Sequence, residues 1–380
     1  DQFQIAGGWG GGTFVGSVGV TLNNLSIKNF FKKGAWRPYP MGQNQRLSIS
    51  AQTNGTYYKA FAISFTDPWM GGRKPNSFTI SAHYSDENNA YYAWQKGTRY
   101  FRTAGVAAGL GKRLDWPDPY FTFYAEASYE RYMLKDWNTF VLKNGAANLL
   151  SIRLVLGRNS VDQPIYPRRG SDFSVSVQLT PPYSLWDGKD YKSTALSEQE
   201  RYNWIEFHKW MLKGQWFTPL TRNGNLVLMA RAEMGYLGHY NKNKVSPFER
   251  FEVGGDGMTG YNMYGIDIIS MRGYDDGALD PVGSNYSCAY NKYTMELRYP
   301  LLLKGQTNIY VLGFLEGGNG FTSWKEFSPF KIKRSAGIGV RLFLPVVGMV
   351  GVDWGWGFDP AAGQTKRSGS HIHFTMGMQF

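Results

Sequence analysis

Polar and apolar residues alternate over several long stretches of the chain. In residues 121–130, apolar side chains at the odd positions interleave with Thr, Tyr, Glu and Ser at the even positions. Residues 150–157, 337–344 and 371–380 repeat this period of two. Because successive side chains of a β-strand point to opposite faces, the pattern predicts strands with one apolar and one polar face.

The same template fits an even number of segments along the whole chain. Sixteen are predicted, beginning near Phe3, Thr13, Gln45, Tyr57, Asn76, Phe101, Tyr120, Leu149, Ser171, Tyr202, Asn225, Cys288, Gln306, Ile332, Val347 and His371. The connections after odd segments include nearly all the long ones, whereas those after even segments are mostly short, with the stretch 23–44 as an exception. An even strand number with alternating long and short connections is typical of an outer-membrane barrel.

The positions of charges and aromatic rings separate a membrane barrel from a soluble sandwich, which would show the same alternation. Charges lie in the middle of segments on the polar face, among them Glu126, Arg153, Arg231, Glu233, Glu296, Arg298 and Arg341. Tryptophans gather at segment ends, where aromatic side chains would meet the two bilayer interfaces. We therefore predict an all-β, 16-stranded antiparallel transmembrane β-barrel over residues 1–380. A large soluble β-protein is the alternative.

Composition narrows the classes of function. The 380 residues include 13 Trp, 25 Tyr, 24 Phe, 46 Gly and one Cys, with a net charge of +12. This aromatic content excludes a disordered chain, and a single Cys excludes a disulfide framework within the chain and a Cys-based zinc site. The basic residues are scattered and not massed in one run, so no nucleic-acid partner is expected.

No catalytic constellation is apparent in the sequence. His371 and His373 share one strand face, but they lack a third metal ligand, and the other histidines are scattered. Serines occur without the Gly-x-Ser-x-Gly turn that activates a nucleophile. We expect no enzymatic activity, no cofactor and no bound metal.

The connection over residues 238–287 is unusually long. It is rich in glycines and aromatic residues and contains the run Ser270-Met271-Arg272-Gly273-Tyr274-Asp275. Long loops in compact proteins are uncommon unless they have a function. Sixteen strands can enclose a water-filled lumen, so a general pore with this loop at its outer vestibule is one interpretation.

The motifs favour a different interpretation. The four residues Met271, Arg272, Gly273 and Tyr274 resemble the signature in the sixth extracellular loop of the BamA superfamily, whose members assemble barrel proteins in the outer membrane or secrete polypeptides. Further stretches resemble superfamily segments in the expected order, namely 67–69, 166–171, 247–251, 254–255, 296–300 and 314–318. The resemblance spans the chain and implies that the sixth loop folds into the lumen. It also implies periplasmic POTRA domains before the barrel.

The resemblance assigns a role to Arg272. A guanidinium inside the lumen needs carboxylate partners, and the superfamily pattern points to Glu296 and Glu316, with Asp353 as a further candidate. These pairs would hold the loop inside the barrel and close the pore.

The resemblance also implies a lateral gate between the first and last strands. The first segment is rich in glycine, which weakens a strand because it loses more backbone freedom and adds no cross-strand packing. A parted seam would offer a strand edge to an incoming chain, largely without regard to its side chains. A frayed barrel corner is the alternative. The predicted gate residues are Phe3, Ile5, Gly7, Gly8, Trp9, Phe374, Met376, Gly377, Met378 and Phe380.

The implied partners are nascent outer-membrane β-barrel proteins, accessory outer-membrane lipoproteins or other assembly subunits, and outer-membrane lipid with lipopolysaccharide. The predicted function is barrel assembly in the outer membrane, with a TamA-like or two-partner-secretion transporter as the alternative. The stretch 23–44 departs from the superfamily pattern, since it is long and carries Lys28, Lys32, Lys33 and Arg37 among aromatic residues. It is either an interfacial turn or a contact for an accessory protein.

Overall fold

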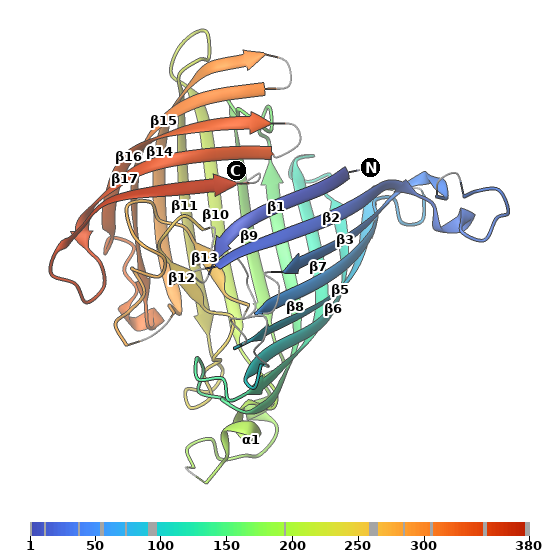
Figure 1. The fold of residues 1–380 in the computed structure, drawn as a ribbon, viewed down its shortest axis with the longest axis vertical. Helices are drawn as coiled ribbons and strands as arrows, with labels where there is room; N and C mark the ends of the chain where they lie inside the picture. The colour runs from blue at the N-terminus through green and yellow to red at the C-terminus, as the bar shows by residue number, and fades with distance from the viewer. Residues whose placement is uncertain are drawn as a thin grey trace.

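The computed structural model describes residues 2–10, 13–36, 39–53, 57–72, 74–89, 97–193, 195–257, 265–283, 286–304, 307–344 and 348–376. Sixteen strands form one antiparallel sheet in the order of the chain. They are β1 (Gln2–Gly10), β2 (Thr13–Leu25), β3 (Met41–Thr53), β4 (Tyr58–Asp67), β5 (Asn76–Asn88), β6 (Tyr100–Arg113), β7 (Phe121–Lys135), β8 (Gly145–Asn159), β9 (Gly170–Leu179), β10 (His208–Pro219), β11 (Val227–Gly238), β14 (Ala289–Lys304), β15 (Thr307–Phe321), β16 (Lys333–Leu344), β17 (Gly348–Pro360) and β18 (Arg367–Met376). Figure 1 shows the sheet curving round into a wall.

The wall has the inverted distribution of polarity that a membrane barrel requires. Apolar side chains in the middle of strands face outward, such as Ile338 and Ile372, which are 64% and 65% exposed. Charged side chains of neighbouring strands, such as Glu296 and Asp353, are buried on the inner face. Period-two alternation therefore separates a lipid-facing surface from a polar lumen. No helix of the described ranges is long and apolar enough to cross a membrane.

The lumen contains the long connection between β11 and β14. Within it, β12 (Phe251–Val253) and β13 (Asp267–Ile269) form a separate two-stranded parallel sheet. Buried apolar residues of the connection pack against buried residues on the inner faces of β6, β7, β8, β11 and β14, and these include Phe248, Phe251, Phe101, Tyr132 and Tyr290. Figure 1 shows β12 and β13 in front of strands β9–β11. The loop and the inner wall therefore share one hydrophobic core inside the barrel.

The sequence prediction of sixteen antiparallel strands is confirmed, with one misplaced start. The segment expected to begin near Tyr202 begins at His208, because Glu198–Tyr202 forms the short helix α1. Ser197 caps this helix, accepting a hydrogen bond from the Glu200 N–H while the Glu200 carboxylate accepts one from the Ser197 N–H. This capping box was readable in the sequence as Ser-x-x-Glu. The remaining starts differ by no more than a few residues, as at β8 and β18.

The first and last strands are the two ends of the sheet. Among the described residues, β1 pairs with β2 alone, from Gln2↔Thr21 to Gly10↔Thr13, and β18 pairs with β17 alone. Within the described part of the chain, no ladder joins β1 to β18. Every other wall strand has a neighbour on each side. We call the junction of β1 and β18 the seam.

Candidate functional site

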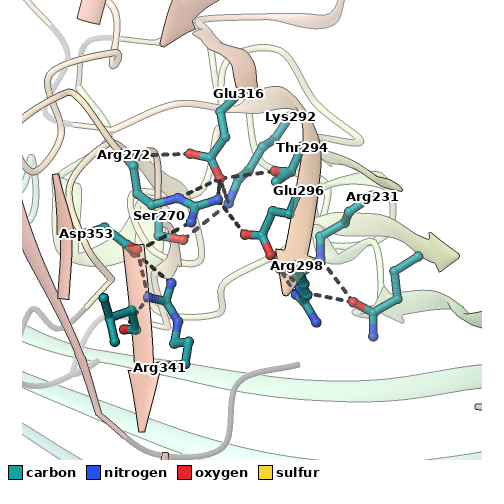
Figure 2. A network of polar contacts seen from close by, with 12 residues as sticks. Arg231, Ser270, Arg272, Lys292, Thr294, Glu296, Arg298, Glu316, Arg341 and Asp353 are labelled. Carbon is teal, nitrogen blue, oxygen red and sulfur yellow. Dashed lines mark hydrogen bonds and ion pairs between the residues drawn. The ribbon is translucent and has the colours of Figure 1, made fainter. Parts of the chain in front are cut away.

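Arg272 lies at the centre of a buried ion-pair network between the long connection and the barrel wall. Its Nη2 is 2.7 Å from Glu296 Oε1 on β14 and 2.7 Å from Glu316 Oε1 on β15. Its Nη1 is 3.5 Å from Asp353 Oδ2 on β17. Figure 2 shows the guanidinium pointing into this group of carboxylates. The structure therefore brings together the arginine and the three acidic residues expected from the sequence, and we call this set the loop lock.

Glu316 makes the most extensive contact with the loop. It accepts hydrogen bonds from the Arg272 backbone N–H at 2.9 Å, from Nε at 3.1 Å and from Nη2 at 2.7 Å. Charge-assisted, multidentate bonds of this kind fix orientation as well as position. The guanidinium carbon also lies 3.7 Å from the centre of the Phe314 ring, so one of its planar faces is covered. Arg272 is thus held from both its backbone and its side chain.

A second layer of cations surrounds the carboxylates. Arg298 lies 2.7 Å from Glu296, Arg341 lies 2.7 Å from Asp353, and Lys292 lies 4.0 Å from Glu316. Lys292 also donates to Ser270 Oγ at 3.2 Å, next to the motif in the chain (Figure 2). Each carboxylate therefore has a cation of the wall as well as Arg272. This arrangement lowers the penalty of placing three acidic groups together in a site of low exposure. The sequence did not identify three of these partners, namely Arg298, Arg341 and Lys292. For Arg298 and Arg341, the available signal was their position in the middle of a strand on the polar face.

Gly273, which follows Arg272 in the motif, brings the backbone of the loop into contact with the backbone of β17. Gly273 has φ +85°, and a Cβ there would lie 2.9 Å from Ser335 Cβ and 3.0 Å from Gly357 N. On the wall, a Cβ at Gly355 would lie 2.8 Å from Gly273 N. Glycine is therefore required on both sides of the contact between the loop tip and β17.

Hydrogen bonds connect the loop tip to the last strands. The Gly273 N–H donates to His373 Nε2 on β18 at 2.8 Å, and the Tyr274 hydroxyl donates to the Arg334 carbonyl on β16 at 2.8 Å. Met271 and Tyr274 are completely buried. The motif thus contacts β14, β15, β16, β17 and β18 in succession, which connects the loop lock to one side of the seam. The sequence did not predict that His373 binds the loop tip, because this position was considered only for metal binding.

The predicted gate residues lie on both sides of the seam. Phe3, Ile5, Gly7, Gly8 and Trp9 all lie in β1, and Phe374 and Met376 lie in β18, where the Phe374 ring faces outward. Gly377, Met378 and Phe380 lie outside the described residues. The structure therefore places the described members of the two groups on the two strands that end the sheet.

No group of three or more His, Cys, Asp or Glu side chains in the described ranges is arranged to hold a metal ion. The carboxylates of the loop lock instead lie beside arginine and lysine side chains.

These features define an outer-membrane β-barrel whose lumen is occupied by one of its own loops. The chain belongs to the Omp85 superfamily, because the Omp85 superfamily domain matches residues 41–380. It is 23% identical over 319 residues to the outer membrane protein assembly factor BamA of Neisseria meningitidis serogroup B, covering 78% of this chain and 32% of that protein. The chain therefore spans about a third of the length of this relative.

Solved structures show the same fold. BamA from Haemophilus ducreyi lacking POTRA domains 1–3 matches with a TM-score of 0.66 at 17% identity, covering 98% of this chain and 68% of that one. CdiB from Escherichia coli matches with a TM-score of 0.57 at 12% identity, covering 98% of this chain and 61% of that one. Both similarities establish the barrel architecture.

Proposed function

We propose that the chain is the barrel of a machine that folds β-barrel proteins and inserts them into the outer membrane through the seam. The observation that carries this proposal is the topology of the sheet, in which β1 and β18 have unpaired outer edges within the described residues. An unpaired strand edge is a template for another strand. The similarity to a BamA assembly factor supports the same function.

The occupied lumen supports a lateral route over a route through the pore. The long connection packs against the inner wall and is fixed by the loop lock. A client chain passing through the lumen would have to displace this loop and separate buried charges, which is costly. A client strand that adds to β1 or β18 leaves the loop in place. The partners of the chain in this proposal are nascent barrel proteins, with accessory subunits and outer-membrane lipid.

The second candidate is export of polypeptides, which the similarity to CdiB favours. Exported chains would cross the lumen after the loop moves. The number of POTRA domains preceding the barrel separates the two classes, since we expect five for a BamA-type assembly factor and two for a two-partner-secretion transporter.

A covalent lock across the seam tests the proposal. Cysteines at Ile5 and at Phe374 or a neighbouring position of β18, in a Cys288→Ala background, would be oxidised in the reconstituted full-length protein. Assembly of a client barrel should stop on oxidation and recover on reduction, because β1 and β18 can no longer part. The matched control joins Leu156 to Val175, which are directly opposite on β8 and β9. Normal client assembly by the seam-locked protein would refute the lateral route.

A further inference from the structure

The connection between β2 and β3 extends away from the barrel. We call residues 26–36 the β2–β3 arm. Figure 1 shows this part of the chain reaching sideways from the wall, to the right of the strands. It lies at the end of the barrel opposite the long β11–β14 connection, and in outer-membrane barrels the end with short turns faces the periplasm. The arm therefore leaves the wall on the periplasmic side.

Hydrogen bonds anchor the base of the arm to the barrel. The Ser26 N–H donates to the Pro40 carbonyl at 2.9 Å, and the Ile27 N–H donates to Gln45 Oε1 at 2.9 Å. Asn29 Nδ2 donates to the Met41 carbonyl at 3.1 Å. The arm contains the short 3₁₀ helix η1 (Ile27–Asn29) and is anchored to the start of β3. Its side chains are therefore presented from a defined backbone.

The arm presents aromatic rings outward. Phe31 is 91% exposed, and Phe30 and Trp36 are each roughly half exposed. The Phe30 ring packs edge-on against both of the others, with centroid separations of 5.5 Å to Phe31 and 4.9 Å to Trp36. Trp36 Nε1 donates to the Phe30 carbonyl at 3.0 Å. A cluster of exposed aromatic rings is unfavourable in water. Such a cluster marks a surface that contacts a membrane or another molecule.

All charged side chains of the arm are positive. Lys28, Lys32 and Lys33 are all exposed, and the sequence 23–44 contains no Asp or Glu. Basic residues next to a bilayer are attracted to acidic headgroups, and the attraction is worth about fivefold in binding for each lysine. Rings flanked by cations without counter-charges are the composition of an interfacial membrane anchor.

Other turns show the level of the membrane surface. Trp69 and Met70 are exposed in the β4–β5 turn, and Trp116 and Tyr120 are exposed in the β6–β7 turn, at the same end of the barrel as the arm. Exposed aromatic residues in this position form the interfacial girdle of an outer-membrane barrel. The arm leaves the wall at the same end as these turns and extends sideways, which is the direction in which a bilayer around the barrel lies.

We propose that the β2–β3 arm is a docking site for acidic phospholipid headgroups of the periplasmic leaflet. The lysines contact the phosphates while Phe31 and Trp36 enter the interface beside them. Among the described residues, β1 pairs with β2 alone, so the docked arm holds the bilayer next to the seam. This role is separate from client assembly, and its test uses no client protein.

A fluorescent label reports docking directly. Ala35→Cys in the Cys288→Ala background gives one thiol on the arm without changing a ring or a lysine, and a polarity-sensitive dye is attached to it. The full-length protein is reconstituted in phosphatidylcholine vesicles with or without phosphatidylglycerol. With phosphatidylglycerol, the dye emission should shift to the blue and a headgroup-level lipid quencher should reach the dye. Added salt should reverse both effects, because it screens the lysines.

Variants separate the charge from the rings. Lys28→Gln/Lys32→Gln/Lys33→Gln should lower the ratio of docked to undocked arm by up to about a hundredfold at low salt and remove its salt dependence. Phe31→Ser should weaken docking but keep the salt dependence. The matched control neutralises three exposed lysines at the other end of the barrel, Lys189, Lys192 and Lys325, and should dock normally.

Two results would overturn the proposal. In the first, the dye stays accessible to an aqueous quencher in both kinds of vesicle. In the second, the dye becomes protected only when periplasmic accessory proteins are added, which would make the arm a protein interface. Heat-modifiability on a gel verifies that each variant is a folded barrel before its docking is measured.

Discussion

At the scale of single residues, Arg272 is the link between the loop and the wall. It is buried, and it contacts carboxylates from three different strands. The sequence could predict these partners because the motif resembles a superfamily signature and because Glu296, Glu316 and Asp353 lie on polar strand faces. The partners of Arg341 and Lys292 could not be predicted, since these two pairs cross between strands and depend on a register that alternation does not specify. Arg298 lies two residues after Glu296 on the same face of β14, so this pair was readable from the sequence.

Arg272→Ala should destabilise the folded barrel. Removal of the guanidinium leaves buried carboxylates without their central partner, which costs about 3 to 5 kcal/mol in a dry site and less in a wet lumen. The loss should appear as a lower unfolding temperature on a heat-modifiability gel. The control is Arg334→Ala, whose partner is Asp359 and whose side chain is 65% exposed, so solvent screens the ion pair and its loss should change the unfolding temperature far less. Equal effects of the two variants would contradict the loop lock.

Gly273→Ala tests the contact between the loop tip and β17 without removing a charge. The added Cβ would lie 2.9 Å from Ser335 Cβ, so the tip must move away from the wall. In a planar bilayer, this variant should conduct more ions than the unmodified protein. Gly283→Ala is the matched control, because Gly283 also has a positive φ of 78° but has no atom within 4 Å of an added Cβ. A larger conductance for the control than for Gly273→Ala would contradict this contact.

At the scale of elements, alternation predicted the wall strands well, because each strand has one face in lipid and one in the lumen. Alternation gave a wrong strand boundary where local residues favour a helix. Around Tyr202 a Ser-x-x-Glu cap and helix-forming residues give α1, so strand β10 starts only at His208. Alternation also could not predict the parallel strands β12 and β13. Each has three residues, which is too short to show a period of two, and the contacts of the loop with the wall hold them in place.

His373 connects the last strand to the loop, and its replacement should loosen that connection. His373→Leu removes the acceptor of the Gly273 N–H and leaves this buried donor without a partner. Hydrogen exchange of residues 271–274 should become faster, by about tenfold for each 1.4 kcal/mol lost. His373→Gln keeps a side-chain acceptor and should restore part of the protection. Unchanged exchange in His373→Leu would show that the tip is held without β18.

At the scale of the whole molecule, the barrel combines a filled lumen with a sheet that has two ends. The loop lock and the neighbouring motif residues contact β14 to β18, whereas β1 and β2 belong to the other side of the seam. The half of the barrel that carries the lock is therefore tied together by buried charges, and the opposite half begins with a strand rich in glycine. We expect the molecule to open at the seam, because separation there breaks no ladder among the described residues, while separation elsewhere breaks many backbone hydrogen bonds worth about 0.5 to 1.5 kcal/mol each.

The most direct test is to trap a client barrel during assembly and map where it touches the machine. Single cysteines at Ile5 on β1 and at Arg153 on the lumen face of β8 would be paired in turn with a cysteine in the last strand of the client. The account predicts a strong disulfide with position 5 and almost none with position 153, since the client strand adds to the edge of β1. Efficient crosslinking at position 153 with none at position 5 would contradict the account and show that the chain passes through the lumen.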